Sequence, residues 1–138
     1  MPRWERKVLP PNHKDHRREL NDWIKGSLPQ GLSFPKVTAF WGNAGHGIGG
    51  HYHPRQWELY FGLSGNGTMA LYEPGRWGED NGPQSDVFEF EKGVWVLIPP
   101  GVRHELRFKT DTILQIASTI PEFDPKDLVV ESMNIFFK

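Results

Sequence analysis

Short runs of β-branched and aromatic residues, separated by glycine and proline turns, dominate the chain from Phe34 onward. The 138 residues include 15 glycines and 12 prolines, and 13% of them are aromatic. The frequent glycine and proline turns favour many short strands and interrupt long helices. The pattern therefore predicts an all-β domain, built as a sandwich or barrel of mostly antiparallel strands.

Eight runs are predicted to be strands, and a ninth segment, 128–137, is a candidate for the last strand. The runs are 37–41, 51–53, 58–63, 68–72, 87–90, 94–98, 104–108 and 112–118. The sequence Ser-Gly-Asn-Gly at 64–67 predicts a hairpin turn between two of them. Residues 45–50 are interpreted as a glycine-rich loop, and 73–85 as a long connection between strands.

The first 33 residues differ from the rest. The first eleven contain three prolines and are expected to form an extended arm. Residues 12–25 predict a short helix, because Asn12 can cap it, apolar residues fall on one face, and Gly26 would end it. We therefore divide the chain into an N-terminal arm and helix, 1–33, and a β-barrel domain, 34–138.

Composition argues against several classes of partner. The 16 basic and 17 acidic residues give a net charge of -1, without the basic excess typical of proteins that bind nucleic acid or anionic membranes. The longest apolar stretch, 94–98, is too short to span a bilayer, and the N-terminal residues lack the apolar core of a secretion signal. We expect a cytoplasmic protein with no nucleic acid and no membrane as partner.

Three histidines and one glutamate form the candidate metal site. In a strand, His51 and His53 point to the same face, because side chains alternate with a period of two. Glu58 starts the next strand after a short turn, and His104 starts a later strand. Since the chain has no cysteine, its metal ligands must be nitrogen or oxygen atoms. This set suits a divalent transition metal such as Mn, Fe, Ni or Zn, although an isolated His-x-His pair is often only a surface feature.

The spacing of these residues resembles a known family. Residues 45–65 read Gly-x5-His-x-His-x4-Glu-x6-Gly, and residues 93–104 read Gly-x5-Pro-x-Gly-x2-His. Together they resemble very closely the two characteristic motifs of the cupin superfamily. One departure is Phe108, where the second motif usually has asparagine. The resemblance implies a small jelly-roll β-barrel with His51, His53, Glu58 and His104 in the positions of the metal ligands.

The cupin resemblance also implies a homodimer, formed through sheet edges or strand exchange. The apolar segment 128–137 is a candidate for that contact. It is an equally good candidate for a strand that closes its own barrel, because exposed sheet edges must be covered.

Two narrower resemblances point to carbohydrate chemistry. Residues 49–53 with 58–69 look like the archaeal-type glucose-6-phosphate isomerases, which share His-Tyr-His, Glu-x-Tyr and Gly-x-Gly-x-Met. Residues 42–53 with 98–105 look like nucleotide-sugar and capsule-polysaccharide cupins. These resemblances imply an isomerase or epimerase with a small-molecule sugar substrate, phosphorylated or nucleotide-linked. The metal would polarise a carbonyl while a base moves a proton, and the candidate bases are Tyr60, Glu105 and His46.

Two other functions use the same ligand set and stay open. One is an Fe(II)-dependent dioxygenase, and the other is a non-catalytic module that binds a sugar or another small molecule. Around the site, strand alternation places Tyr60, Leu106 and Phe108 inside the barrel, whereas Gln115 fits either face. Three arginines close to the motifs are either solvated or available to an anionic group, namely Arg55, Arg103 and Arg107.

Overall fold

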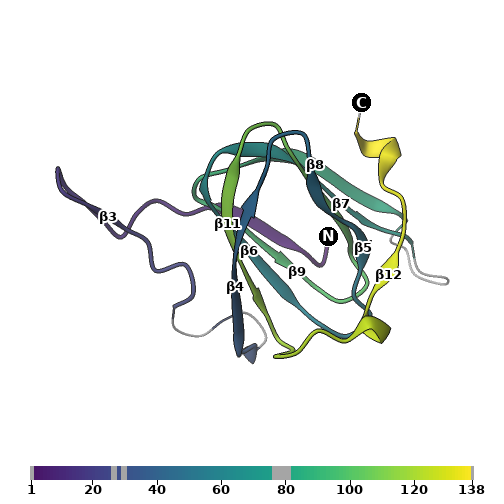
Figure 1. Ribbon diagram of the computed structural model, residues 1–138. Helices are drawn as coiled ribbons and strands as arrows, with labels where there is room; N and C mark the ends of the chain where they lie inside the picture. Colours follow the sequence, from purple (N-terminus) through teal and green to yellow (C-terminus); the bar gives the residue numbers. More distant parts are fainter. Residues whose placement is uncertain (1, 26–27, 29–30, 76–81, 138) are drawn as a thin grey trace.

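The computed structural model describes residues 2–25, 28, 31–75 and 82–137, and it is a sandwich of two five-stranded antiparallel sheets (Figure 1). The first, called the β6 sheet, has the order β1 (Glu5–Val8), β9 (Val94–Ile98), β6 (Glu58–Ser64), β11 (Thr112–Ser118) and β4 (Lys36–Gly42). The second, called the β10 sheet, has the order β12 (Val129–Val130), β5 (Gly47–Tyr52), β10 (Arg103–Phe108), β7 (Asn66–Glu73) and β8 (Gln84–Glu91). The all-β expectation is confirmed.

The two sheets do not close into one hydrogen-bonded barrel, which corrects the expected β-barrel. No ladder between described residues joins the β6 sheet to the β10 sheet. From β4 to β12, every connection between consecutive strands instead crosses from one sheet to the other, except that from β7 to β8. The turn at 64–67 therefore joins strands of different sheets and does not form the predicted hairpin. This crossing produces a jelly roll, in which two sheets face each other over a shared core.

The core between the sheets consists of alternate residues from both of them. Leu71 and Leu106 of the β10 sheet and Val96 and Leu114 of the β6 sheet are fully buried there. The alternation in β10 is complete, since His104, Leu106 and Phe108 are buried and the residues between them are only half-buried. The interior placement predicted from strand alternation is therefore correct for this strand.

Three of the four glycines in the expected loop 45–50 lie in a strand, namely Gly47, Gly49 and Gly50. β5 begins at Gly47, and its glycines let the backbone of β10 approach closely. A Cβ on Gly47 would lie 2.6 Å from the carbonyl oxygen of Leu106, and one on Gly49 would lie 2.5 Å from that of His104. The absence of side chains therefore permits the β5–β10 ladder, which a loop assignment overlooked.

The predicted N-terminal helix is absent, and a hairpin of β2 (His13–Lys14) and β3 (Glu19–Leu20) takes its place. Short polar side chains hold the hairpin: Asp15 accepts hydrogen bonds from the backbone N–H groups of Arg17 and Arg18. Asn12, the expected cap, accepts from the backbone of Asp22 across the hairpin. Such local bonds compete with helix formation. Gly26, the predicted helix end, lies outside the described residues.

The N-terminal segment nevertheless buries its apolar residues. It covers the outer face of the β6 sheet, where Trp23 stacks on Phe61 with ring centroids 5.3 Å apart. The indole N–H of Trp95 donates to the carbonyl of Trp23 over 3.0 Å. β1 also joins this sheet by pairing with β9. The division of the chain at residues 33 and 34 stays a prediction.

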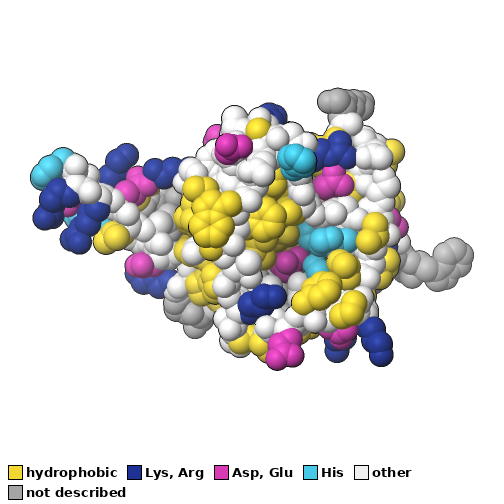
Figure 2. All heavy atoms as spheres, viewed as in Figure 1, with side chains coloured by type: hydrophobic (Ala, Val, Ile, Leu, Met, Phe, Trp, Pro, Cys, Tyr) yellow, Lys and Arg dark blue, Asp and Glu magenta, His cyan; other side chains and the backbone are white. Residues whose placement is uncertain are grey.

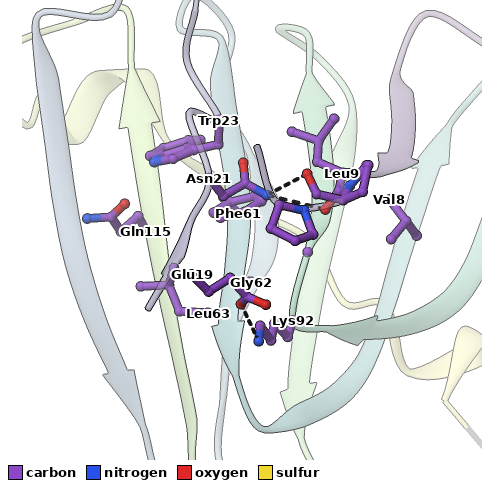
Figure 3. Close-up of a pocket in the computed structure, with 13 residues that line it drawn as sticks. Val8, Leu9, Glu19, Asn21, Trp23, Phe61, Gly62, Leu63, Lys92 and Gln115 are labelled. Atoms are coloured by element: carbon purple, nitrogen blue, oxygen red, sulfur yellow. Dashed lines mark hydrogen bonds and ion pairs between the residues drawn. The ribbon is translucent and has the colours of Figure 1, made fainter. Parts of the chain in front are cut away.

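A cavity of about 430 Å³ lies between this segment and the sheet (Figure 3). Trp23, Phe61 and Gln115 line it, and the ion pair of Glu19 and Lys92 stands at its side. Because Phe61 and Gln115 belong to the outer face of the sheet, the cavity is on the opposite face from Glu58 and Tyr60. Gln115 is thus an outward residue.

The C-terminal segment follows β5 along the edge of the β10 sheet (Figure 1). Only Val129 and Val130 form a strand, which pairs with Tyr52 and His51. Two 3-10 turns, Pro125–Asp127 and Asn134–Phe136, flank this short strand. Of the two interpretations of segment 128–137, the structure supports the one in which it covers an edge of its own fold. Among the described residues, no helix has the length and apolarity needed to cross a membrane.

The turn after β6 provides a stability test. Gly65 has φ +78°, and a Cβ there would lie 2.1 Å from the carbonyl oxygen of Asp111, whereas Gly45 has φ +82° with nothing within 4 Å. Gly45→Ala should cost only the left-handed backbone strain, about 1 to 2 kcal/mol. Gly65→Ala adds a backbone clash and should cost roughly 3 kcal/mol or more in urea unfolding. Equal losses in the two variants would contradict this account.

Candidate metal centre

The four predicted ligands meet at one point between the two sheets. One ligand atom from each of His51, His53, Glu58 and His104 lies within 4.8 Å of the other three. Two metal–ligand bonds of about 2 to 2.5 Å place ligand atoms at most about 4 to 5 Å apart. The cluster is therefore the right size for one metal ion. Figure 2 shows histidine and acidic side chains together in a hollow of this face, bordered by hydrophobic side chains.

A bulge in the β5–β10 ladder sets two of the imidazoles opposite each other. His104 pairs with His51, the next pair joins Glu105 to Gly49, and Gly50 is left over. Gly49 and Gly50 have φ values of +100° and +72°, which L side chains rarely adopt. The bulge brings the rings of His51 and His104 to a centroid distance of 4.7 Å. Bulges of this kind often re-aim side chains at functional sites.

Glu58 reaches the cluster from the opposite sheet. It is the first residue of β6, and only 7% of it is exposed. Its Oε1 lies 3.0 Å from Nε2 of His53 and 3.0 Å from Nε2 of His104. The carboxylate thus connects the two sheets through imidazoles.

Backbone carbonyls fix the orientation of two rings. Nδ1 of His53 is 2.7 Å from the carbonyl oxygen of Asp127, and Nδ1 of His104 is 3.0 Å from that of Val102. Because a carbonyl oxygen only accepts, Nδ1 must donate in both rings. Nε2 then points to the cluster, and in the neutral ring it carries the lone pair that a metal needs.

Mutual contacts and burial shift the pKa values in the cluster. Burial, followed by the neighbouring His104 and His53, lowers the pKa of His51 to about 4. Burial also lowers the pKa of His53, but the Glu58 carboxylate outweighs it and the net pKa is raised. Burial would raise the pKa of Glu58, but the imidazoles of His104 and His53 hold it well below its usual range. His51 is thus a neutral donor, and Glu58 is a charged one, at neutral pH.

The residues fit a divalent metal ion, because the buried donors lack other partners. Neither Oε1 of Glu58 nor Nε2 of His104 makes a hydrogen bond of acceptable geometry to any described residue, although both atoms are buried. Buried polar atoms without partners are costly and rare in native proteins. Three imidazole nitrogens and one carboxylate oxygen are also a ligand set that transition metals prefer.

Tyr60 alone among the three candidate bases lies beside the cluster. Its ring is 5.9 Å from that of His104 and is 2% exposed, and burial together with Glu58 raises its pKa. Glu105 follows His104 on the outward face, where it pairs with Arg107. Glu105 and the exposed His46 line a groove on that side. The structure does not bring Glu105 or His46 to the cluster.

The three arginines near the motifs all have acidic partners. Arg55 pairs with Asp124 over 2.7 Å and Arg103 pairs with Glu131. Arg107 contacts Glu105 and also the side-chain oxygen of Asn134. The hypothesis that they are simply solvated is thus incomplete, because each takes part in an ion pair.

Phe108, the departure from the second motif, is a packing residue. It is 4% exposed and its ring centroid is 6.0 Å from that of Phe40. A Cβ on Gly42 would lie 2.2 Å from the Phe108 ring. Phe108 thus packs in the core, and the four ligand positions come together with phenylalanine at this position.

Sequence reasoning missed Asp127, which contacts His53 through its carbonyl oxygen. A carbonyl acceptor leaves no trace in residue identity. The available signal was Asp124-Pro125, which favours a turn and here forms the capped 3-10 turn that ends at Asp127.

Comparisons with known proteins identify the fold. No protein-family model matches the chain, and no curated protein matches it. Three solved structures with a similar fold are of enzymes named for, or bound to, nucleotide-linked sugars. A variant of the 3,4-ketoisomerase QdtA from Thermoanaerobacterium thermosaccharolyticum, in complex with TDP-4-keto-6-deoxyglucose, has 16% identity and a TM-score of 0.74, over 99% of this chain and 92% of that one.

The other two are epimerases. The dTDP-4-dehydrorhamnose 3,5-epimerase from Sulfolobus tokodaii has 20% identity and a TM-score of 0.70, over 87% of this chain and 72% of that one. The 3'-monoepimerase ChmJ from Streptomyces bikiniensis, in complex with dTDP-quinovose, has 16% identity and a TM-score of 0.77, over 92% of this chain and 68% of that one. At these identities the likeness shows the fold alone, which is a jelly roll of two antiparallel sheets.

Metal binding can be tested by removing the least buried ligand. His51 is only partly buried, so His51→Ala should leave the core intact. Loss of a direct ligand should weaken Zn²⁺ or Ni²⁺ binding by more than about 100-fold, since losing outer partners alone costs 10- to 100-fold. Isothermal titration calorimetry measures the affinity, and His46→Ala, an exposed histidine outside the cluster, is the matched control. Equal affinity in both variants would refute the assigned ligand set.

Proposed function

We propose that this chain is a metal-dependent cupin that acts as an isomerase or epimerase on a sugar, phosphorylated or nucleotide-linked. The observation that carries the proposal is the cluster of three imidazoles and a carboxylate between the two sheets, at a hollow of the surface (Figure 2). The similarity in fold to a ketoisomerase and epimerases of nucleotide-linked sugars supports this substrate class. Because fold alone does not determine function, the site carries more weight than the fold.

Each residue of the cluster has a separate role in the proposed chemistry. A divalent ion held by the four ligands would act as a Lewis acid toward a carbonyl or hydroxyl oxygen of the sugar. Glu58 supplies the negative charge, and His53 and His104 are held rigidly by their carbonyl partners. The apolar interior next to the cluster, including Leu106 and Ile98, limits access of water. Electrostatic interactions are stronger in such surroundings.

Tyr60 is the residue we assign to proton handling. It lies two residues from Glu58 on the same face of β6, and its ring meets His104 edge-on. Neither Glu105 nor His46 shares this position, because both are on the outer side of β5 and β10. A general acid or base must lie within hydrogen-bond reach of the reacting atom, so geometry favours Tyr60.

We further infer a homodimer. β4 is the edge strand of the β6 sheet, and it exposes 51% of Val37 and 70% of Trp41. An exposed apolar edge strand of this length favours pairing with another chain.

Activity can be tested by deuterium exchange. Metal content of the purified protein is measured first by elemental analysis. The protein is then reconstituted with each candidate metal and incubated in D2O with 4-keto-6-deoxy nucleotide sugars and with sugar phosphates. An isomerase or epimerase should incorporate deuterium at the carbon next to the carbonyl, detected by NMR, without consuming O2. Consumption of O2 with Fe(II) would instead indicate a dioxygenase, and binding of a sugar without exchange would indicate a binding module.

Tyr60→Phe tests the assigned proton-transfer group. The variant retains the buried ring and loses the hydroxyl, so the fold and the metal content should be unchanged. The exchange rate should fall by about 10²- to 10⁴-fold, the usual contribution of a general acid or base. Gln115→Ala, on the outer face of the same sheet, is the control and should keep the wild-type rate. A Tyr60→Phe variant as active as the control would exclude Tyr60 from catalysis.

A further inference from the structure

His53 is positioned differently from the other three ligands. His51 lies within β5, Glu58 within β6 and His104 within β10, so sheet hydrogen bonds fix their backbones. His53 lies one residue beyond the end of β5 and is followed by Pro54, which has no N–H to donate. Contacts from outside the strand must therefore hold His53 in place.

Two such contacts involve His53 itself. Its carbonyl oxygen accepts a hydrogen bond from the backbone N–H of Gly101 over 2.9 Å. Its Nδ1 donates to the carbonyl oxygen of Asp127 over 2.7 Å. The first contact fixes the backbone, and the second fixes the rotation and tautomer of the ring. The ring is thus oriented by a residue 74 positions away in the chain.

Asp127 is fastened to the same turn by its side chain. Its Oδ1 accepts from the backbone N–H of Arg55 over 2.7 Å, two residues after His53. Its own N–H donates to the carbonyl of Asp124 over 2.9 Å, within the 3-10 turn. The side chain is 3% exposed, and its Oδ2 has no hydrogen-bond partner among the described residues. Burial of a carboxylate in this state is costly, which indicates a role beyond surface solvation.

We propose that Asp127 is the positioning residue for the metal ligand His53, an inference that rests on the proposed metal-dependent function. Its carboxylate clamps the turn at residues 53–55, and this clamp places its carbonyl oxygen against Nδ1 of His53. Nε2 of His53 is then presented to the cluster in one orientation. Loss of the clamp frees the ring to rotate, and a freely rotating ligand binds metal more weakly.

The test compares variants of Asp127 in the full-length protein. Asp127→Ala removes the clamp and should weaken Zn²⁺ binding by about 10- to 100-fold, as measured by calorimetry. Asp127→Asn keeps an oxygen that can accept from the Arg55 N–H, and it should restore most of the affinity. Glu131→Gln is the matched control, because it changes an acidic partner of Arg103 on the same segment without touching His53.

A spectroscopic measurement separates positioning from a general loss of stability. In the Cu²⁺-loaded protein, electron paramagnetic resonance reports the imidazole nitrogens bound to the metal. Wild type and Glu131→Gln should show three, and Asp127→Ala should show a signal with a reduced nitrogen contribution. If Asp127→Ala does not fold, Asp127→Ser gives the same comparison, because its short hydroxyl cannot replace the carboxylate clamp.

The outcomes for Asp127 and for the function are distinct. Wild type without metal affinity would overturn the proposed function together with its metal site. Wild type that binds metal, with Asp127→Ala or Asp127→Ser of equal affinity and identical spectrum, would overturn the positioning role alone. An Asp127→Asn variant as weak as Asp127→Ala would also overturn it, because the clamp would not then depend on an acceptor oxygen.

Discussion

The contact of the Glu58 carboxylate with His53 and His104 is the interaction on which the site depends. A carboxylate buried this deeply would be strongly destabilising without partners. Its two imidazole neighbours, each at 3.0 Å, come from the opposite sheet and the turn beside it. The same arrangement keeps a polar cluster between the apolar inner faces of the two sheets, and Figure 2 shows histidine and acidic side chains together in a hollow of the surface. A bound cation would satisfy the atoms that remain unpaired.

The fold supplies this contact by bringing distant segments together. β5 and β10 are paired neighbours in one sheet, and β6 faces them from the other, so residues 51 and 104 meet residue 58 although 51 and 104 are far apart in the chain. The bulge at Gly50 places His51 opposite His104, and the carbonyls of Val102 and Asp127 set the ring orientations. The bulge and the two carbonyl groups are features of the backbone, so the ligand geometry is imposed before any metal binds. Preorganisation of this kind is what a functional site on rigid strands requires.

Strand periodicity was sufficient to predict most of the strands and to suggest that His51 and His53 share a face. Glu58 and His104 joined the ligand set with the support of the resemblance to the cupin motifs, which alternation alone does not provide. Alternation also places Glu105, next to His104, on the outward face, so its candidacy was already weak by parity. The predicted N-terminal helix was wrong because Asn12 can cap a helix or hold a turn. The local bonds of Asn12 and Asp15 and the packing of Trp23 on Phe61 favour the hairpin. The sequence could not reveal the role of Asp127, because its contact with His53 is made by a backbone carbonyl oxygen that every residue type has. The sandwich in place of a closed barrel depends on strand pairing, which spacing does not encode.

The ligand set alone does not select a reaction, because isomerases, oxygenases and binding modules can all use three imidazoles and a carboxylate. Selection must come from groups that contact the substrate beside the metal. A phosphate group of a sugar substrate needs cations, yet Arg103 pairs with Glu131 and stacks 3.9 Å from the ring centroid of Tyr52. A substrate that used Arg103 would therefore replace Glu131, on the segment that Asp127 fastens to His53. In that case, substrate recognition and metal geometry would share one element, the C-terminal segment along β5.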